Sequence, residues 1–311
     1  MFLLQFRPAY ATDLVGWQEK VRSKLLDLIA YDRTFHDATL QILSSESGEV
    51  EGTLQTRYVA QSGSWQPQPI YALVPASGRL NGVTLVTFHG HGDDPFTGIY
   101  AYVRELARRG YRVVMPILYG KMERETKQMP YDPRTVCASW SIDADTLGTT
   151  LLGIRLFDGV LAYRLAEQLP GVDRERIASI GLSMGGELSL YLAAIETGIR
   201  VCVSAGFLST FGSLLLERGN CQCYSIRDWP RYFDMPDIVG CIAPRPLQVQ
   251  KGENDPCFDA QDVADAFGQV QRIYAAVGQP QRAEYVTYPG DHCLHVDHAQ
   301  AFLRANLPHD V

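Results

Sequence analysis

The chain has 311 residues, of which 46% are hydrophobic and 20% are charged, and its formal net charge is −7. This composition is typical of a globular protein and excludes wholesale disorder. The acidic balance disfavours nucleic acid or an anionic membrane as partner, and no stretch reaches the roughly 18 uninterrupted apolar residues that a membrane span requires. We therefore expect a small-molecule substrate, with no nucleic acid and no membrane as partner.

The cysteines bear on the compartment of the protein and on metal binding. Seven cysteines, an odd number in a long chain, do not indicate a disulfide framework, so we expect a cytoplasmic protein. Cys221 and Cys223 form a C-x-C pair, but no second Cys/His pair occurs at zinc-like spacing. We interpret the pair as structural, with a redox-labile pair as the alternative, and we expect no metal and no cofactor.

The N-terminal part of the chain contains one helical pattern followed by extended segments. Residues 12–31 carry apolar side chains near helical spacing, which predicts an amphipathic helix within an extension, residues 1–35, that packs on the domain. Its apolar face could also support a homo-oligomer. Residues 50–59 and 69–74 have the pattern of extended strands. No repeat or low-complexity linker interrupts the sequence, so residues 1–311 are expected to form a single domain.

From residue 83 onward, apolar runs alternate with helical patterns. Strands are expected at 83–88, 111–116, 176–180, 200–204, 246–250 and 283–288, and helices at 97–109, 148–169, directly after Ser183 and at 259–277. Continuous apolar runs are typical of strands that are covered on both faces. The alternation predicts an α/β fold with a mostly parallel central sheet and helices on both faces.

Two stretches, residues 117–147 and 207–235, do not fit this alternation. Both follow predicted strands at what would be their carboxyl ends, where open α/β sheets place their ligands. We expect them to form lids or pocket walls, with Trp140, Tyr224 and Trp229 lining the substrate pocket. The alternative is that they are long loops stabilised by aromatic packing.

The segment Gly181-Leu182-Ser183-Met184-Gly185 lies between a predicted strand and a predicted helix. A nucleophilic serine at such a junction occupies a tight turn in strained backbone geometry, and small residues on either side let the strand and the helix approach closely. The serine also projects beside the positive end of a helix, which favours a developing anion. We predict that Ser183 is a nucleophile, the alternative being a glycine-rich turn at a helix start.

A serine nucleophile needs a base and an acid, which follow it in the order acid, then histidine, on this type of sheet. His292 leaves the last predicted strand in a tight glycine turn, and we favour it over His295 as general base. Asp255 follows the strand at 246–250 and is expected to orient the imidazole, with Glu253 as the alternative acid. Because His292 lies in a Pro-Gly turn, we disfavour a metal cluster of His292, His295, His298, Asp291 and Asp297.

An oxyanion hole requires two fixed N–H donors. We expect one to be the amide of Met184 and the other to be the amide of His91, in the glycine loop after the strand at 83–88. Gly90 and Gly92 permit the close approach of backbone that this role requires. The imidazoles of His89 and His91 are interpreted as structural.

Several segments together carry a family resemblance. They are His89-Gly-His-Gly-Asp-Asp, Gly181-Leu-Ser-Met-Gly-Gly-Glu-Leu, Arg231-Tyr-Phe-Asp-Met-Pro, Ile242-Ala-Pro-Arg-Pro-Leu, Gly252-Glu-Asn-Asp-Pro and Tyr288-Pro-Gly-Asp-His. In these segments the chain resembles the dienelactone-hydrolase-like and acetyl-xylan-esterase-like branch of the α/β-hydrolases. The likeness covers residues 80–307 and, less clearly, the N-terminal helix and strands.

The resemblance implies the α/β-hydrolase fold, carboxylic esters as substrates, often acetylated sugars, and Ser183, Asp255 and His292 as the catalytic triad. The chain departs from the family at two points, since dienelactone hydrolase itself has a cysteine nucleophile and Asp291 replaces the usual glycine before the histidine. We therefore expect a serine carboxylesterase that forms an acyl-enzyme. The alternatives are a peptidase or acyl-aminoacyl hydrolase on the same fold and a non-catalytic ligand-binding homologue.

Overall fold

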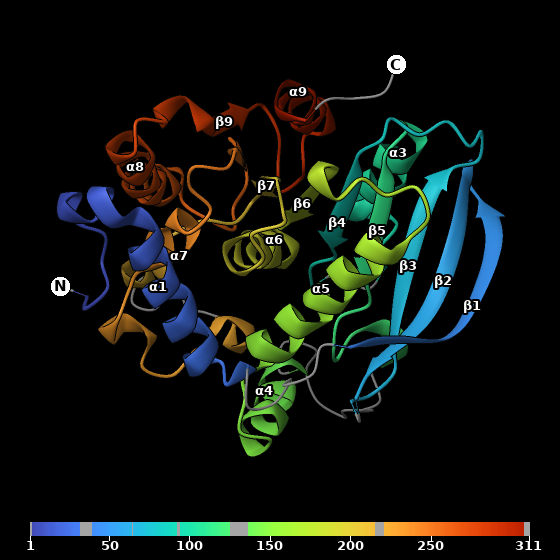
Figure 1. The fold of residues 1–311 in the computed structure, drawn as a ribbon, viewed down its shortest axis with the longest axis horizontal. Helices are drawn as coiled ribbons and strands as arrows, with labels where there is room; N and C mark the ends of the chain where they lie inside the picture. Colours follow the sequence, from blue (N-terminus) through green and yellow to red (C-terminus); the bar gives the residue numbers. More distant parts are fainter. Residues whose placement is uncertain are drawn as a thin grey trace.

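The strands of the chain form one central sheet. The computed structural model describes residues 2–31, 39–63, 65–91, 94–124, 136–214 and 221–307. Within these residues, nine strands are ordered β1-β2-β3-β5-β4-β6-β7-β8-β9 across the sheet (Figure 1). The strands are β1 (Leu40–Val50), β2 (Thr53–Ser62), β3 (Gln68–Pro75), β4 (Thr84–Phe88), β5 (Arg112–Pro116), β6 (Ile177–Leu182), β7 (Val201–Ala205), β8 (Leu247–Gly252) and β9 (Ala283–Tyr288).

The sheet is antiparallel at one edge and parallel elsewhere. Strands β1, β2, β3 and β5 pair antiparallel in that order, whereas β5, β4 and β6 to β9 pair parallel. In the parallel part, neighbouring residues of one strand point to opposite faces. Leu85 of β4 therefore packs into one hydrophobic core while Val86 packs into the other, and both are fully buried. This confirms the predicted α/β class with a mostly parallel sheet.

Helices cover both faces of the sheet. They are α1 (Leu14–Leu28), α3 (Tyr102–Arg108), α4 (Val136–Thr146), α5 (Leu151–Gln168), α6 (Met184–Ile195), α7 (Met235–Gly240), α8 (Ala260–Ala276) and α9 (Val296–Asn306). The buried side chains of α3 and α9 belong to one core cluster, and those of α1 and α4 to α8 belong to the other. In the part of the chain that the structure describes, no helix is both long enough and apolar enough to cross a membrane.

Strand β1 and helix α4 are the elements that differ most from expectation. β1 is exposed along almost its whole length and has no apolar alternation, so it gives no strand signal. It forms by antiparallel pairing with β2 from Leu40 opposite Ser62 to Val50 opposite Thr53. Residues 136–146, expected to be irregular, form α4.

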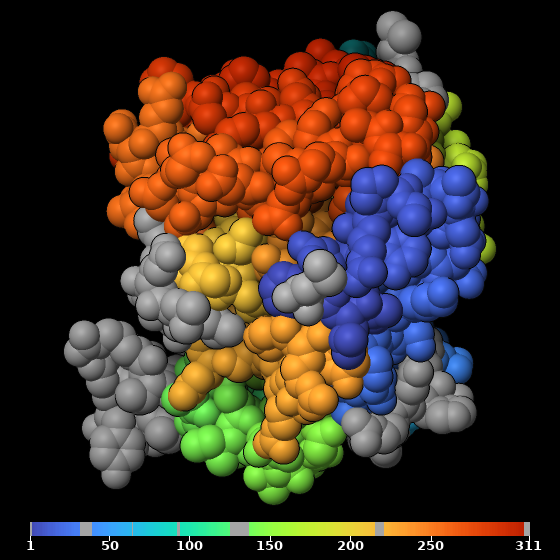
Figure 2. Space-filling model, turned by 90° about the vertical axis from the view of Figure 1, so that its left-hand side faces the viewer, coloured from blue at the N-terminus to red at the C-terminus, as the bar shows by residue number. Residues whose placement is uncertain are grey.

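Helix α1 packs against α7, and the 3-10 helix η1 (Pro8–Asp13) that precedes it packs against α8. Gln18 Nε2 donates to the carbonyl oxygens of Gly240 at 3.2 Å and Ala243 at 2.6 Å, and Trp17 Nε1 donates to the carbonyl of Leu4 at 2.8 Å. Figure 2 shows this N-terminal segment, in blue, beside the orange segments. Trp17 is buried there, whereas Leu3 and Val15 of the same segment are exposed, and a homo-oligomer stays a prediction. Residues 32–35 of the predicted extension lie outside the described residues.

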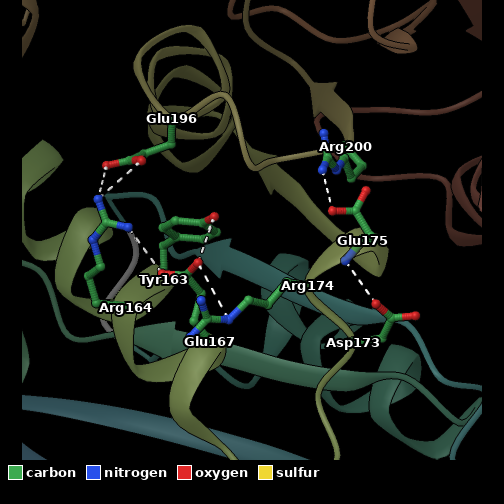
Figure 3. A network of polar contacts seen from close by, with 8 residues as sticks. All are labelled: Tyr163, Arg164, Glu167, Asp173, Arg174, Glu175, Glu196 and Arg200. Carbon is green, nitrogen blue, oxygen red and sulfur yellow. Dashed lines mark hydrogen bonds and ion pairs between the residues drawn. The ribbon is translucent and has the colours of Figure 1, made fainter.

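Ion pairs connect the elements that precede β6 and β7. Arg164 of α5 contacts Glu167 at 3.0 Å and Glu196 at 3.2 Å, and Arg200 pairs with Glu175 (Figure 3). Exposed pairs of this kind are worth about 0–1 kcal/mol each. The network lies at the amino ends of the parallel strands, which leaves the carboxyl ends for the functional site.

Candidate active site

Ser183 occupies the tight turn between β6 and α6. Its backbone has φ 61° and ψ −129°, a conformation that is costly for a residue with a side chain and that persists only where the surroundings enforce it. Its N–H donates to the carbonyl of Ala205 at the end of β7, at 2.9 Å. A Cβ on Gly185 would lie 2.2 Å from the carbonyl oxygen of Phe88, so only glycine allows α6 to start against β4.

His292 and Asp255 form a hydrogen-bonded pair between the ends of β8 and β9. His292 Nδ1 lies 2.8 Å from Asp255 Oδ2, and the Asp255 side chain is 1% exposed. The alternative acid, Glu253, is exposed. Burial opposes ionisation of Asp255, but hydrogen bonds from His292 and from the Cys257 N–H hold the pKa of its carboxyl below the usual value. Asp255 is therefore suited to fix the orientation and tautomer of the imidazole.

The serine and the histidine contact two adjacent residues at the end of β7. Ser183 N–H bonds to Ala205, and an ideal Cβ on the next residue, Gly206, would lie 2.8 Å from His292 Cε1 and 3.2 Å from Asp255 Oδ2. Gly206 has φ +58° and carries no side chain, so the imidazole can pack directly on the backbone. The three predicted triad residues thus come from the carboxyl ends of β6, β8 and β9 and gather around β7.

The glycine loop after β4 lies against the first turn of α6. The carbonyls of Phe88 and His89 are the closest atoms to a Cβ built on Gly185, so the loop and the amide of Met184, the first residue of α6, are near neighbours. A helix N-terminus presents unpaired N–H groups and a positive dipole end. The backbone N–H of Met184 therefore has the position that its predicted role as oxyanion donor requires. Gly92, predicted to permit close approach, lies outside the described residues.

His89 joins the glycine loop to the segment after β5. Its Nε2 accepts a hydrogen bond from Leu118 N–H at 3.1 Å, and Nδ1 lies 3.0 Å from the carbonyl of Gly90. This arrangement requires a neutral ring with its proton on Nδ1. Complete burial lowers the pKa of His89 to about 3, which keeps the ring neutral. The geometry gives the His89 imidazole a structural role.

Two aromatic residues predicted to line the pocket are core residues, which corrects that prediction. Trp229 is 1% exposed and its ring centre lies 4.1 Å from that of Phe211. Trp140 is 3% exposed and packs edge-on against Tyr119 at 5.0 Å. For these two indoles the structure agrees with the alternative, that the segments are stabilised by aromatic packing.

Tyr224 is the predicted pocket residue that lies beside the glycine loop. Its ring centre is 6.0 Å from that of His91 and 5.5 Å from that of Phe207. The two predicted lid segments contact each other here, because α4 packs on the short 3-10 helix η7 (Gln222–Tyr224). A cavity of about 440 Å³ is lined by residues of both segments. Residues 125–135 and 215–220 lie outside the described residues, and movement of the segments remains a prediction.

One group of potential metal ligands was missed by the sequence analysis. His91, Cys137, Cys221 and Cys223 place one ligand atom each within 4.8 Å of one another. The lack of a second Cys/His pair at zinc-like spacing does not exclude a metal at Cys221 and Cys223, because folding brings two further potential ligands beside them. His91 and Cys137 are distant in sequence, so no local pattern could have revealed them.

Comparison with known proteins identifies the class to which this fold and site belong. The chain superimposes with a TM-score of 0.74 on the structure of Methylesterase BT1017, at 17% identity, covering 94% of this chain and 64% of that one. It superimposes with a TM-score of 0.59 on Acetyl Xylan Esterase 1 from Thermoanaerobacterium sp. JW/SL YS485, at 18% identity, covering 93% of each chain. The chain thus has the α/β-hydrolase fold.

Sequence comparison places the chain in a family. The model of the Dienelactone hydrolase family matches residues 72–290, which is more than half of the chain. The chain belongs to this family, as the resemblance implied. It is also 27% identical over 135 residues to a protein named "Putative hydrolase YtaP" from Bacillus subtilis (strain 168). That match spans 42% of this chain and 45% of the relative, under half the length of each.

Proposed function

We propose that this protein is a serine hydrolase of carboxylic esters, with Ser183 as nucleophile, His292 as general base and Asp255 as the acid that orients the base. One observation carries the proposal. A strained serine at a helix N-terminus bonds to Ala205, and an acid-paired histidine packs on the next residue, Gly206. Membership of the Dienelactone hydrolase family and a fold like that of named esterases support ester chemistry.

The first half of the reaction forms an acyl-enzyme. Asp255 holds the proton on His292 Nδ1, which leaves Nε2 as the ring atom that accepts the proton of Ser183 Oγ. The serine oxygen attacks the ester carbonyl carbon, and the carbonyl oxygen becomes an oxyanion. The amides of Met184 and His91 donate to this oxyanion. The tetrahedral intermediate then collapses, the bond to the alkoxy oxygen breaks, and His292 gives its proton to the departing alcohol.

The second half of the reaction regenerates the enzyme. Water enters after the alcohol leaves, and His292 Nε2 takes one of its protons as the water oxygen attacks the acyl carbon. The second oxyanion is held by the same two amides. Collapse releases the carboxylic acid and returns the proton from His292 to Ser183 Oγ. No metal or cofactor takes part in this sequence of steps.

The proposal extends to the substrate class and to the location of the protein. We propose small acyl esters as substrates, with deacetylation of sugars as the most specific form. We propose the cytoplasm as the location, because the seven cysteines, all within the described residues, form no disulfide. A cell-fractionation experiment that recovers the protein outside the cytoplasm would refute the location without affecting the chemistry.

Replacing the nucleophile tests the proposal. Ser183→Ala should lower kcat on p-nitrophenyl acetate by about 10⁶-fold, because the two steps of acyl transfer both need Oγ. Ser77→Ala is the matched control, since Ser77 lies exposed in the turn after β3 and its Oγ accepts only from Arg79 in the described contacts. Both variants should unfold at the wild-type urea concentration within error. Wild-type turnover by Ser183→Ala would refute the assignment.

A matched ester and amide decide the reaction class. We expect the ester of a given acyl group to be hydrolysed and the amide of the same acyl group to resist hydrolysis. Preference for the amide would establish a peptidase-type activity instead. Failure to hydrolyse either compound, in a protein that also fails to react with a fluorophosphonate, would establish a non-catalytic homologue.

A further inference from the structure

Four metal-ligating side chains from three separate segments converge beside the glycine loop. His91 belongs to that loop, Cys137 lies in the first turn of α4, and Cys221 and Cys223 flank the start of η7. His91 Nε2 is 3.2 Å from Cys223 Sγ and 3.5 Å from Cys221 Sγ, and the two sulfur atoms are 3.0 Å apart. All four ligand atoms lie within 4.8 Å of one another.

These separations suit a tetrahedral metal ion better than a disulfide. With Zn–S near 2.3 Å and Zn–N near 2.0–2.1 Å, two ligand atoms of a tetrahedral site are about 3.5–3.8 Å apart. The distances that His91 Nε2 makes to the two sulfurs are within a few tenths of an ångström of that value. The Cys221–Cys223 separation of 3.0 Å is almost 1 Å longer than a disulfide bond of about 2.05 Å and about 0.8 Å shorter than the separation of two zinc-bound sulfurs.

The charge around the cluster complements a zinc–thiolate centre. Three thiolates, one neutral imidazole and one Zn²⁺ carry a net charge of −1. Arg155, 1% exposed, places Nη1 4.0 Å from Cys137 Sγ, and its Nη2 is buried with no hydrogen-bond partner among the described residues. Lys121 Nζ donates to the carbonyl of His91 at 3.3 Å. A buried guanidinium is costly without counter-charges. The buried carboxyl groups of Asp158 and Glu187 interact with Arg155, and an anionic metal centre would add a third partner.

We propose that His91, Cys137, Cys221 and Cys223 bind one structural Zn²⁺ ion. Four protein ligands close the coordination shell, so the ion has no open position for a substrate or water and acts as a cross-link. On binding, the three thiols release their protons to solvent and no electron is transferred. The ion ties the glycine loop to α4 and η7, so, if the proposed function holds, it also positions the His91 amide in the oxyanion hole.

Metal analysis tests the proposal without reference to activity. The full chain, purified without chelator and then dialysed, should retain one Zn²⁺ per chain by inductively coupled plasma mass spectrometry. Cys223→Ser and Cys137→Ser should each weaken zinc binding by more than about 100-fold, since loss of a mere second-shell partner costs 10–100-fold. Cys257→Ser is the matched control. This exposed cysteine belongs to the other potential ligand group, with Asp255 and His292, so the variant distinguishes zinc bound at one group from zinc bound at the other. It should leave the zinc content at one.

Three further measurements keep the test decisive if a serine variant fails to fold. Cys221→His preserves a ligand at that position and should retain zinc, whereas Cys221→Ser should not. Co²⁺ substituted into the wild-type chain should give the visible absorption of a tetrahedral thiolate site. After unfolding in a chelator without reductant, all seven cysteines should react as thiols.

Several results would overturn the zinc site. One is a count of five reactive thiols instead of seven, which would indicate a disulfide. The others are binding of copper or iron in place of zinc, and a zinc content that Cys137→Ser, Cys221→Ser and Cys223→Ser do not affect. The outcome is separable from that of the proposed function. A chain that binds zinc but hydrolyses no ester would leave the metal site intact and refute only the ester chemistry.

Discussion

Gly206→Ala tests whether the contact between β7 and the imidazole matters for turnover. Gly206 follows β7 with φ +58°, and its N–H donates to Gln250 at 3.0 Å. A Cβ at this position would lie 2.8 Å from His292 Cε1, 3.0 Å from His292 Nδ1 and 3.2 Å from Asp255 Oδ2. The substitution therefore pushes on both members of the acid–base pair without removing any polar group.

The magnitude has two independent parts. The left-handed backbone conformation costs an L-residue with a side chain about 1–2 kcal/mol, which should appear as lost stability. An ordinary carbon contact is about 3.5 Å, so the His292 ring must move by about 0.7 Å to admit the methyl group. A displacement of about 1 Å in a catalytic group can cost about 10²-fold in rate, so kcat/KM should fall by close to 10²-fold.

The assay compares Gly206→Ala with Gly171→Ala. Gly171 also has a left-handed φ of +74°, but the nearest atom to its Cβ would be Arg112 Nη2 at 3.9 Å, far from the site. Urea unfolding should show a similar loss of stability for both variants, whereas p-nitrophenyl acetate hydrolysis should fall only in Gly206→Ala. Wild-type turnover in Gly206→Ala, or an equal loss in Gly171→Ala, would refute the reasoning.

Three further predictions concern the acid, a buried histidine and a buried ion pair. Asp255→Asn should lower kcat by about 10⁴-fold because asparagine favours the wrong imidazole tautomer, and an unchanged kcat would exclude Asp255 as the acid. His89 is neutral when folded, with a pKa of about 3, but titrates near 6.5 when unfolded, so its contribution to stability is present above pH 6.5 and lost as pH falls. In urea unfolding, the free energy of unfolding should fall by about 2 kcal/mol between pH 7 and pH 5 because of this group. The fall should be absent in His89→Gln. The same dependence of stability on pH in both proteins would contradict the prediction. Asp158→Asn removes the carboxylate 2.8 Å from buried Arg124 and should cost about 3–5 kcal/mol, while Arg124→Met/Asp158→Asn should be more stable than Asp158→Asn alone. If the double variant is less stable than Asp158→Asn alone, the cost of Asp158→Asn does not come from leaving Arg124 without its partner.

The sequence predicts those parts of the fold that depend on local patterns. Fully buried strands such as β4 and β6 require continuous apolar runs, which are visible without a structure. The turn at Ser183 is equally visible, because close packing of β6, α6 and β4 excludes side chains at Gly181 and Gly185. Local chemistry is therefore enough to predict the proposed nucleophile and the parallel sheet.

The remaining features depend on residues that are distant in the chain. Choosing between Asp255 and Glu253 depends on how the loop after β8 curls, and the structure turns Asp255 inward and Glu253 outward. Trp229 was expected on a pocket wall but is enclosed by residues of other segments. Strand β1 has an exposed sequence and is stabilised by its pairing with β2. Each of these is a tertiary effect that overrides the local pattern.

Covalent labelling tests the central claim most directly. The chain is incubated with a fluorophosphonate, digested, and analysed by peptide mass spectrometry, in parallel with His292→Ala. The account predicts a single phosphonyl adduct on Ser183 in the wild-type chain and a large loss of labelling in His292→Ala, because the hydroxyl needs that base to lose its proton. An adduct on a different residue, or undiminished labelling of Ser183 without His292, would contradict it.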